Sequence, residues 1–326
     1  MKRNFIHPAV GAGLALLLAA GCSRTIAEGP ASGAIGFAAP VTRAAVERFA
    51  AGDAFSVWGW YTPADAGSEV FNATKVSTAD GTSWSYENPR FWKAGRSYTF
   101  QALSPSVEQL AAATASCTSD GVLTVQDFDA SQQVDLMAAA SPAMAGSAPA
   151  PVSFAFSHLL ARVQLVGRLS ESSAGVAGFD PRVYSVRLYG IPALGSLTLD
   201  TALLGDAEAL RSAWSPSGTT SATAPAALFT SDAGAAVSAD GTLLLDALPL
   251  PQQLSQTAVV EIEYATNGSG ERQTATVQLT SLPVTLWEAG RQYRYTFTIA
   301  DNDRILFDIP TVNPWSEAVG GIVIVD

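Results

Sequence analysis

The stretch WKAGRSYTF at positions 92–100 recurs as WEAGRQYRY at positions 287–295 of a chain of 326 residues. The shared frame is W-x-A-G-R-x-Y-x-aromatic. Glycine permits a tight turn, and the two aromatic residues that follow are two apart, so on a strand they face the same side. The repeat therefore predicts two related β modules, each with an aromatic strand directed into a core. A sugar-binding aromatic platform is the functional alternative, but aromatic residues with a period of two favour the core.

Alternation with a period of two recurs along the chain and predicts many short strands. Four clear examples are residues 55–61, 184–188, 259–264 and 274–279. Asn267-Gly268 lies between the last two, and this dipeptide favours a tight hairpin turn. Helical periodicity is limited to 107–115 and 207–214. The segment 138–151, rich in Ala, Pro and Ser, is predicted to be a linker or an exposed crossing between domains. The fold class is therefore all-β, with strand lengths typical of sandwiches.

Composition excludes several classes of protein. Lys and Arg number 18 against 29 Asp and Glu, and a net charge of −11 offers no electrostatic footprint for nucleic acid. Hydrophobic residues make up 48%, which argues against disorder, and two cysteines cannot form a disulfide scaffold. Two histidines leave little for acid–base or metal chemistry, and the common catalytic motifs are absent from the sequence. We therefore expect no enzyme activity, no cofactor and no metal site.

The few candidates for chemistry favour structural roles. His158 lies among Phe154, Phe156 and Leu160 in the sequence, so we expect a core or interface histidine that makes one hydrogen bond. The aspartates near position 130 lack the spacing and closing Glu of a calcium loop. Solvated turn carboxylates are the favoured interpretation.

The N-terminus has the features of an export signal. Lys2 and Arg3 precede an apolar run at 9–20, which is too short to span a bilayer but fits a signal peptide. The run ends at Ala19-Ala20-Gly21-Cys22, which resembles a bacterial lipobox, where the cysteine thiol is acylated and becomes the first mature residue. We therefore expect residues 1–21 to be a lipoprotein signal peptide and Cys22 to be the lipidation site. An ordinary secretory signal is the alternative.

A series of short motifs occurs in a defined order along nearly the whole mature chain. They lie at 35–37, 42–44, 52–61, 92–105, 134–138, 154–163, 287–297 and 312–315. In this order they resemble the fimbrillin family of Bacteroidetes surface lipoproteins, which includes the subunits of type V pili. The resemblance implies two tandem transthyretin-like β-sandwich domains, here expected at 22–150 and 151–326.

The resemblance also implies a structural function, as a pilus (fimbria) subunit or an accessory adhesin. In pilus-forming members an Arg-specific protease cuts behind the first strand, that strand leaves, and a strand of the next subunit fills the groove. The matching positions are Arg43 and Arg48 for cleavage, and Ile35 and Phe37 for the departing strand. The candidate donor strand is Ile322-Val323-Ile324-Val325, an uncharged β-branched run that favours burial. Closure of its own domain by this run is an equal alternative.

The expected partners are other pilus subunits, identical or homologous, and the lipid bilayer reached through acylated Cys22. The expected location is the outer membrane and cell surface, and the fimbrium after processing. The second interpretation is a lipid-anchored module that never polymerises and binds a glycan or a host protein. Exposed Trp58 or Trp60 would favour it, because an aromatic platform needs access to solvent. Asp200-Thr201-Ala202 resembles a Bacteroidetes O-glycosylation site with Thr201 as acceptor, and a plain turn is the alternative.

Overall fold

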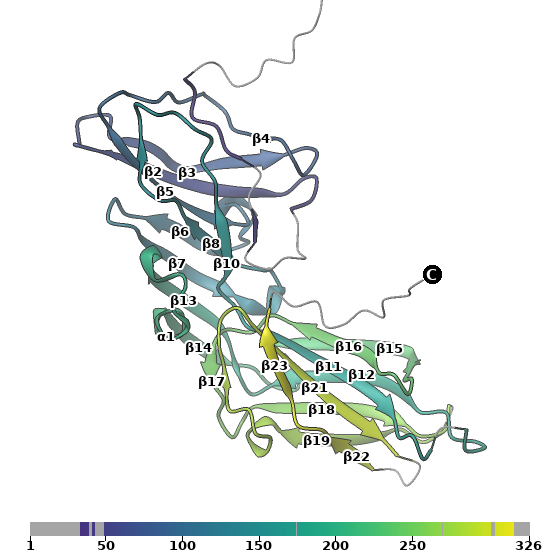
Figure 1. The fold of residues 1–326 in the computed structure, drawn as a ribbon. Helices are drawn as coiled ribbons and strands as arrows, with labels where there is room; N and C mark the ends of the chain where they lie inside the picture. The colour runs from purple at the N-terminus through teal and green to yellow at the C-terminus, as the bar shows by residue number, and fades with distance from the viewer. Residues whose placement is uncertain are drawn as a thin grey trace, which may run out of the picture.

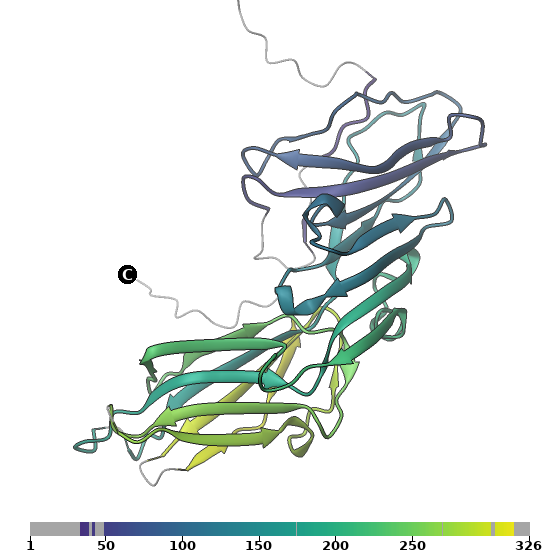
Figure 2. The same ribbon diagram turned by 180° about the vertical axis from the view of Figure 1, so that it is seen from behind.

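The computed structural model describes residues 33–38, 41–42, 49–173, 175–268, 270–300 and 304–315. Most regular elements in these ranges are strands, and they form four larger sheets and one two-stranded ladder (Figures 1 and 2). The predicted all-β sandwich class is therefore confirmed. The signal peptide 1–21, Cys22, Arg43, Arg48 and the run Ile322–Val325 lie outside the described residues.

Sheet 1 has the strand order β1-β10-β8-β5-β2-β3-β4, and β9 pairs with β5. Its strands are β1 (Val41–Thr42), β2 (Ala54–Thr62), β3 (Glu69–Thr78), β4 (Trp84–Ser85), β5 (Ser97–Ser104), β8 (Met137–Ala140), β9 (Met144–Ala145) and β10 (Ala155–His158). Sheet 2 has the order β14-β13-β7-β6. Its strands are β6 (Thr114–Cys117), β7 (Val122–Asp129), β13 (Pro192–Asp200) and β14 (Trp214–Thr219).

Strand β2 is buried on both faces, as its apolar sequence predicts. Trp58 joins Val125 and Leu197 of sheet 2 in one hydrophobic core. Phe55 and Tyr61, at alternate positions of the same strand, belong to a separate aromatic core. Because neighbouring residues of a strand point to opposite faces, sheet 1 is a middle layer with a core on each side.

Sheets 3 and 4 form the second half of the molecule. Sheet 3 has the order β16-β11-β21-β22, with β23 also paired to β21, and sheet 4 has the order β15-β12-β18-β19. The strands of sheet 3 are β11 (Arg162–Leu169), β16 (Thr242–Ala247), β21 (Arg291–Ile299), β22 (Ile305–Phe307) and β23 (Thr311–Pro314). Those of sheet 4 are β12 (Arg182–Tyr189), β15 (Ala227–Ala236), β18 (Val259–Ala265) and β19 (Gln273–Gln278), and the short ladder is β17 (Gln252–Gln253) with β20 (Leu286–Trp287).

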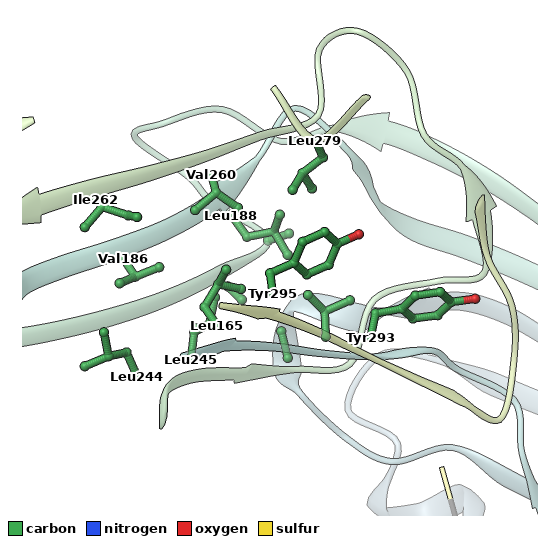
Figure 3. Packing of buried hydrophobic residues seen from close by; sticks show 14 of the residues in the cluster. Leu165, Val186, Leu188, Leu244, Leu245, Val260, Ile262, Leu279, Tyr293 and Tyr295 are labelled. Carbon is green, nitrogen blue, oxygen red and sulfur yellow. The ribbon is translucent and has the colours of Figure 1, made fainter. Parts of the chain in front are cut away.

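A core fills the space between sheets 3 and 4 (Figure 3). Leu165 and Tyr295 of sheet 3 cluster with Val186, Leu188 and Ile262 of sheet 4. Along β18 and most of β21 the inward-facing residues alternate with more exposed ones, which is the burial pattern of a sandwich. In the ribbon view, β2, β3 and β5 lie at one end of the molecule and β12, β18 and β21 at the other, with β6, β7 and β13 between them (Figure 1).

Helices are few and short. They are α1 (Ala207–Ala213) and the single-turn helices η1 (Val107–Gln109), η2 (Ala130–Gln132), η3 (Thr201–Leu203) and η4 (Leu279–Ser281). The helix predicted at 207–214 is therefore confirmed, whereas the one predicted at 107–115 is a single 3-10 turn followed by β6. In the described part of the chain, no helix has the length and apolar character that a membrane span requires.

The two copies of the repeat have the same local structure. Gly95 and Gly290 both adopt a positive φ, of 76° and 67°, which glycine tolerates without strain. In each copy the tyrosine hydroxyl accepts a hydrogen bond from a backbone N–H before the turn: Tyr98 from Lys93 at 2.7 Å, and Tyr293 from Glu288 at 2.8 Å. Both tyrosines are buried. The repeat is thus a turn that leads into a core strand, which agrees with the core role that its period of two favours.

The prediction of a linker at 138–151 is wrong for the parts of this segment that form strands. It begins inside β8 and contains β9, and both strands pair with β5. Ala138 and Ala139 are fully buried. Alanine has a low β propensity, so the run carries no local strand signal, and its small side chains nonetheless fit in the interior of sheet 1.

Strands from both sides of position 150 share sheets. After this position, β10 pairs with β8 in sheet 1, and β13 pairs with β7 in sheet 2. The hydrogen bonding therefore groups residues 155–158 and 192–219 with the N-terminal strands. The division into domains at 22–150 and 151–326 stays a prediction.

Candidate functional site: an inserted N-terminal segment

Residues 33–38 form an extended segment, here called the inserted segment, with a backbone partner along each edge. On one edge it runs antiparallel to residues 90–92. The N–H of Ile35 donates to the carbonyl of Arg90 at 2.7 Å, and the N–H of Trp92 donates to the carbonyl of Gly33 at 3.0 Å.

The other edge runs parallel to the chain around Val152. The N–H of Ala38 donates to the Val152 carbonyl at 2.9 Å, and the N–H of Val152 donates to the Gly36 carbonyl at 2.8 Å. The same parallel pairing continues into β1, where Val41 is opposite Ala155 of β10. The segment thus has the pairing of an interior strand rather than that of an edge strand, with partners far away in the sequence.

The side chain of Phe37 enters a box of four aromatic rings, here called the Phe37 box. Its ring centroid lies 5.6 Å from Phe71, 5.6 Å from Tyr86 and 6.1 Å from Phe55, all in edge-on geometry, and 6.0 Å from Phe154 in stacked geometry. These are the separations and orientations that aromatic pairs prefer. Phe37 is only 8% exposed, so the box holds the inserted segment through its side chain as well as its backbone.

Ile35 is 1% exposed and lies in the same aromatic core. Its carbonyl accepts a hydrogen bond from the hydroxyl of Tyr86 at 2.7 Å, and that hydroxyl also accepts one from the N–H of Arg90 at 3.1 Å. Burial raises the pKa of Tyr86, so its phenol stays protonated and able to donate. One tyrosine therefore contacts both buried positions of the segment.

The candidate cleavage sites follow the inserted segment directly. Strand β1 ends at Thr42, and the next described residue is Phe49. The Phe49 ring lies 5.3 Å from Trp84 and 5.4 Å from Phe156, so it belongs to the aromatic core. Arg43 and Arg48 belong to the connection between these two points and lie outside the described residues.

Other candidates from the sequence lie in the interior. Trp58 is fully buried, and Trp60 packs partly buried against the core between sheets 1 and 2. Neither offers the open face that a glycan platform needs. Thr201 is 5% exposed, and its hydroxyl donates to the carbonyl of Gly121 at 2.9 Å. Glycosylation of Thr201 would have to break this bond, so the folded chain disfavours that prediction.

His158 is a buried residue at the junction of the two halves. Its Nδ1 lies 3.0 Å from Oδ1 of Asp135, and its ring stacks on Trp315 with a centroid distance of 3.8 Å. It is 4% exposed, which agrees with the expected core or interface histidine. Within the ranges that the structure describes, no three side chains of metal-binding type come together.

Sequence reasoning did not identify the residues that hold the inserted segment. No sequence pattern connects Tyr86 and Phe154 with Phe37, and of residues 90–92 the repeat singles out Trp92 alone. The alternation of Phe154 and Phe156 does signal a strand that faces a core. No local pattern, however, shows which core it faces.

The fold and the inserted segment define an all-β sandwich protein in which an N-terminal segment completes an aromatic core. A family model described as fimbrillin-like matches residues 42–315, and the chain belongs to this family. A comparison with curated proteins gave no match.

Solved structures from Bacteroides share the fold. A protein of Bacteroides uniformis, provisionally described as a cell adhesion protein, has a TM-score of 0.56 at 19% identity, over 88% of this chain and 100% of that one. A fimbrial protein of Bacteroides vulgatus has a TM-score of 0.58 at 17% identity, over 86% of this chain and 99% of that one. A protein of Bacteroides ovatus, with the same provisional description as the first, has a TM-score of 0.51 at 18% identity, over 82% and 88%.

Proposed function

We propose that this protein is a pilus subunit or an accessory adhesin of the cell surface, exported as a lipoprotein and assembled by donor-strand exchange after Arg-specific cleavage. Membership of the fimbrillin-like family supports a structural surface role. The similar structures, which are described as a fimbrial protein and provisionally as cell adhesion proteins, point in the same direction.

The observation that carries this proposal is the two-sided pairing of the inserted segment. A cut at Arg43 or Arg48 would leave the segment held by non-covalent contacts alone. The two buried side chains contribute roughly 3–6 kcal/mol, and each backbone hydrogen bond adds about 0.5–1.5 kcal/mol. A donor strand that buries two side chains of its own offers burial on the same scale, so exchange is energetically balanced and a donor can compete for the groove.

Lipidation fits the same scheme. Cys22 precedes the inserted segment, and both arginines follow it. Acyl chains on Cys22 would hold the precursor at the membrane, because each buried CH₂ contributes about 0.8 kcal/mol. A single cut behind β1 would then break the covalent link between the lipid and the body of the protein, so that departure of the inserted segment would free the body and open the groove together.

The test is proteolysis of the purified precursor with an Arg-specific protease, followed by mass spectrometry and electron microscopy. We expect a cut after Arg43 or Arg48 and the appearance of fibres. Arg43→Lys and Arg48→Lys, singly and together, keep the charge and identify the site that is cut. Cleavage after which the inserted segment stays bound and only monomers form would contradict assembly by exchange and would assign the chain to the accessory or non-polymerising members.

A further inference from the structure

The groove beneath the inserted segment is shaped for an aromatic side chain. Three rings of the Phe37 box pair with Phe37 in T-shaped geometry, and Phe154 is stacked at an interplanar angle of 15°. Both geometries are ones that the quadrupoles of aromatic rings favour, and an aliphatic side chain at position 37 cannot form such pairs.

The walls of the box have little freedom to collapse around a smaller occupant. Phe55 and Phe71 are fully buried and belong to a packed aromatic core. At Gly59 an added Cβ would lie 2.6 Å from the ring of Phe100 and 3.1 Å from that of Phe71, so these rings already fill the space a side chain would need. In such dense packing, a side chain smaller than Phe37 would leave a gap, and the rings that line the gap would lose van der Waals contacts.

Residues 316–326, which include the candidate donor run Ile322–Val325, cannot supply the missing ring. Residues 316–326 read SEAVGGIVIVD and contain no Phe, Tyr or Trp. Ile322 with Ile324, or Val323 with Val325, matches the two-residue spacing of Ile35 and Phe37. Every register of this segment nevertheless places an aliphatic, small, hydroxyl or acidic side chain where Phe37 lies.

We infer that this groove is matched to a donor strand of another protein, one that carries an aliphatic residue followed two positions later by an aromatic residue. The inference rests on the donor-strand exchange proposed above and adds which side-chain pattern the donor strand carries. The donor runs parallel to residues 152–156 and antiparallel to 90–92, as the inserted segment does. The hydroxyl of Tyr86 binds a backbone carbonyl, which any peptide supplies, so selection depends on the side chain in the Phe37 box. The C-terminal segment of a second copy is then a weak ligand for this groove.

Peptide competition on the cleaved full-length chain tests the inference. A fluorescent peptide of residues 33–42 reports occupancy, and the competitors are unlabelled 33–42, its Phe37→Ile form, the peptide 316–326, and its Ile324→Phe and Val325→Phe forms. We expect the better of the two aromatic tail peptides to bind at least about tenfold more tightly than the natural tail, or about 1.4 kcal/mol. Phe37→Ile should lose at least as much relative to unlabelled 33–42.

The outcomes separate this inference from the proposed function. Equal binding by the natural tail and by both of its aromatic forms would overturn the inference and leave strand exchange intact. Failure of every peptide to bind, unlabelled 33–42 included, would overturn both.

A chain that the protease does not cut would contradict the proposed function alone, because the aromatic preference can still be measured in the intact chain. There, Phe37→Tyr should retain most of the stability that Phe37→Ile loses in urea denaturation. Equal stabilities of these two variants would contradict the aromatic preference, and this comparison needs no cleavage.

Discussion

The hydroxyl of Tyr86 donates a hydrogen bond to the backbone carbonyl of Ile35 at 2.7 Å, across 51 positions of sequence. The ring of the same tyrosine meets Phe37 edge-on. Tyr86 follows β4 and therefore fastens the inserted segment to a hairpin of sheet 1. This residue gives direct experimental access to how firmly the segment is held.

Replacement of Tyr86 by Phe should loosen the inserted segment while preserving its ring contacts. The substitution removes two hydrogen bonds of the hydroxyl, the one it donates to the Ile35 carbonyl and the one it accepts from the Arg90 N–H. At about 0.5–1.5 kcal/mol each, their loss corresponds to roughly 5- to 150-fold faster local opening. Hydrogen exchange of peptides that contain Ile35 and Trp92 measures this. Tyr184→Phe is the matched control, because it removes a comparable bond to the Gly268 carbonyl at 3.0 Å in the other half. Unchanged exchange at Ile35 in the Tyr86 variant would refute the role of this hydroxyl.

Loss of the Phe37 ring should be much more costly. Phe37→Ala leaves a cavity in the aromatic core, and substitutions of this kind lower the free energy of unfolding by about 3–5 kcal/mol. Gly36→Ala, on the same segment, should have little effect, because no atom lies within 4 Å of the added Cβ and its φ lies outside the left-handed region. Chemical denaturation compares the two. A similar stability for both variants would show that the segment contributes little to the fold.

Gly59 is needed for close packing within β2. An added methyl group would collide with the rings of Phe100 and Phe71, so Gly59→Ala should destabilise the chain by about 1–3 kcal/mol. At Gly67 the nearest atoms would lie at 3.5 Å, an ordinary contact, and Gly67→Ala serves as the control. The midpoint of urea unfolding compares both variants. An unchanged midpoint for Gly59→Ala would count against tight packing of the Phe100 and Phe71 rings against β2.

Stability should fall at alkaline pH through two buried tyrosines of the second core. Burial raises the pKa of Tyr293 to about 12, and it raises that of Tyr295 as well. In the unfolded chain a tyrosine ionises near pH 10, at about its reference pKa. The unfolded state therefore loses protons first, so this stabilisation is complete below pH 10 and is lost as the pH rises toward 12. Tyr293→Phe should flatten the decline in the free energy of unfolding over this interval, and a profile identical to that of the unsubstituted chain would contradict the assignment.

Local structure could be predicted wherever a pattern determines it by itself. Gly95 and Gly290 set the same turn in both copies of the repeat, and the tyrosines that follow are buried as their spacing predicts. Sheet membership could not be predicted in this way, because it depends on partners far away along the chain. The pairing of β13 with β7, across the predicted boundary at 150, leaves no trace in either strand's own sequence.

In the candidate site, too, local features could be predicted from the sequence and distant partners could not. Ile35 and Phe37 were identified through the family resemblance, and the structure places both in the aromatic core. That they leave the groove stays a prediction. Their alternation marks them as core-facing, but the choice of Tyr86 and Phe154 as neighbours results from packing between distant segments. The alanines of β8 were missed for the opposite reason, since small side chains carry almost no pattern at all.

The parallel pairing of the inserted segment with Val152 has a consequence for biogenesis. During synthesis, residues 33–38 emerge first, but the backbone that receives them is made much later. The segment can dock only after residues 90–92 and Val152 have been made, and contacts so distant in the sequence form slowly. Until it docks, the Phe37 box has no occupant, so another extended strand with the same side-chain pattern would compete for it.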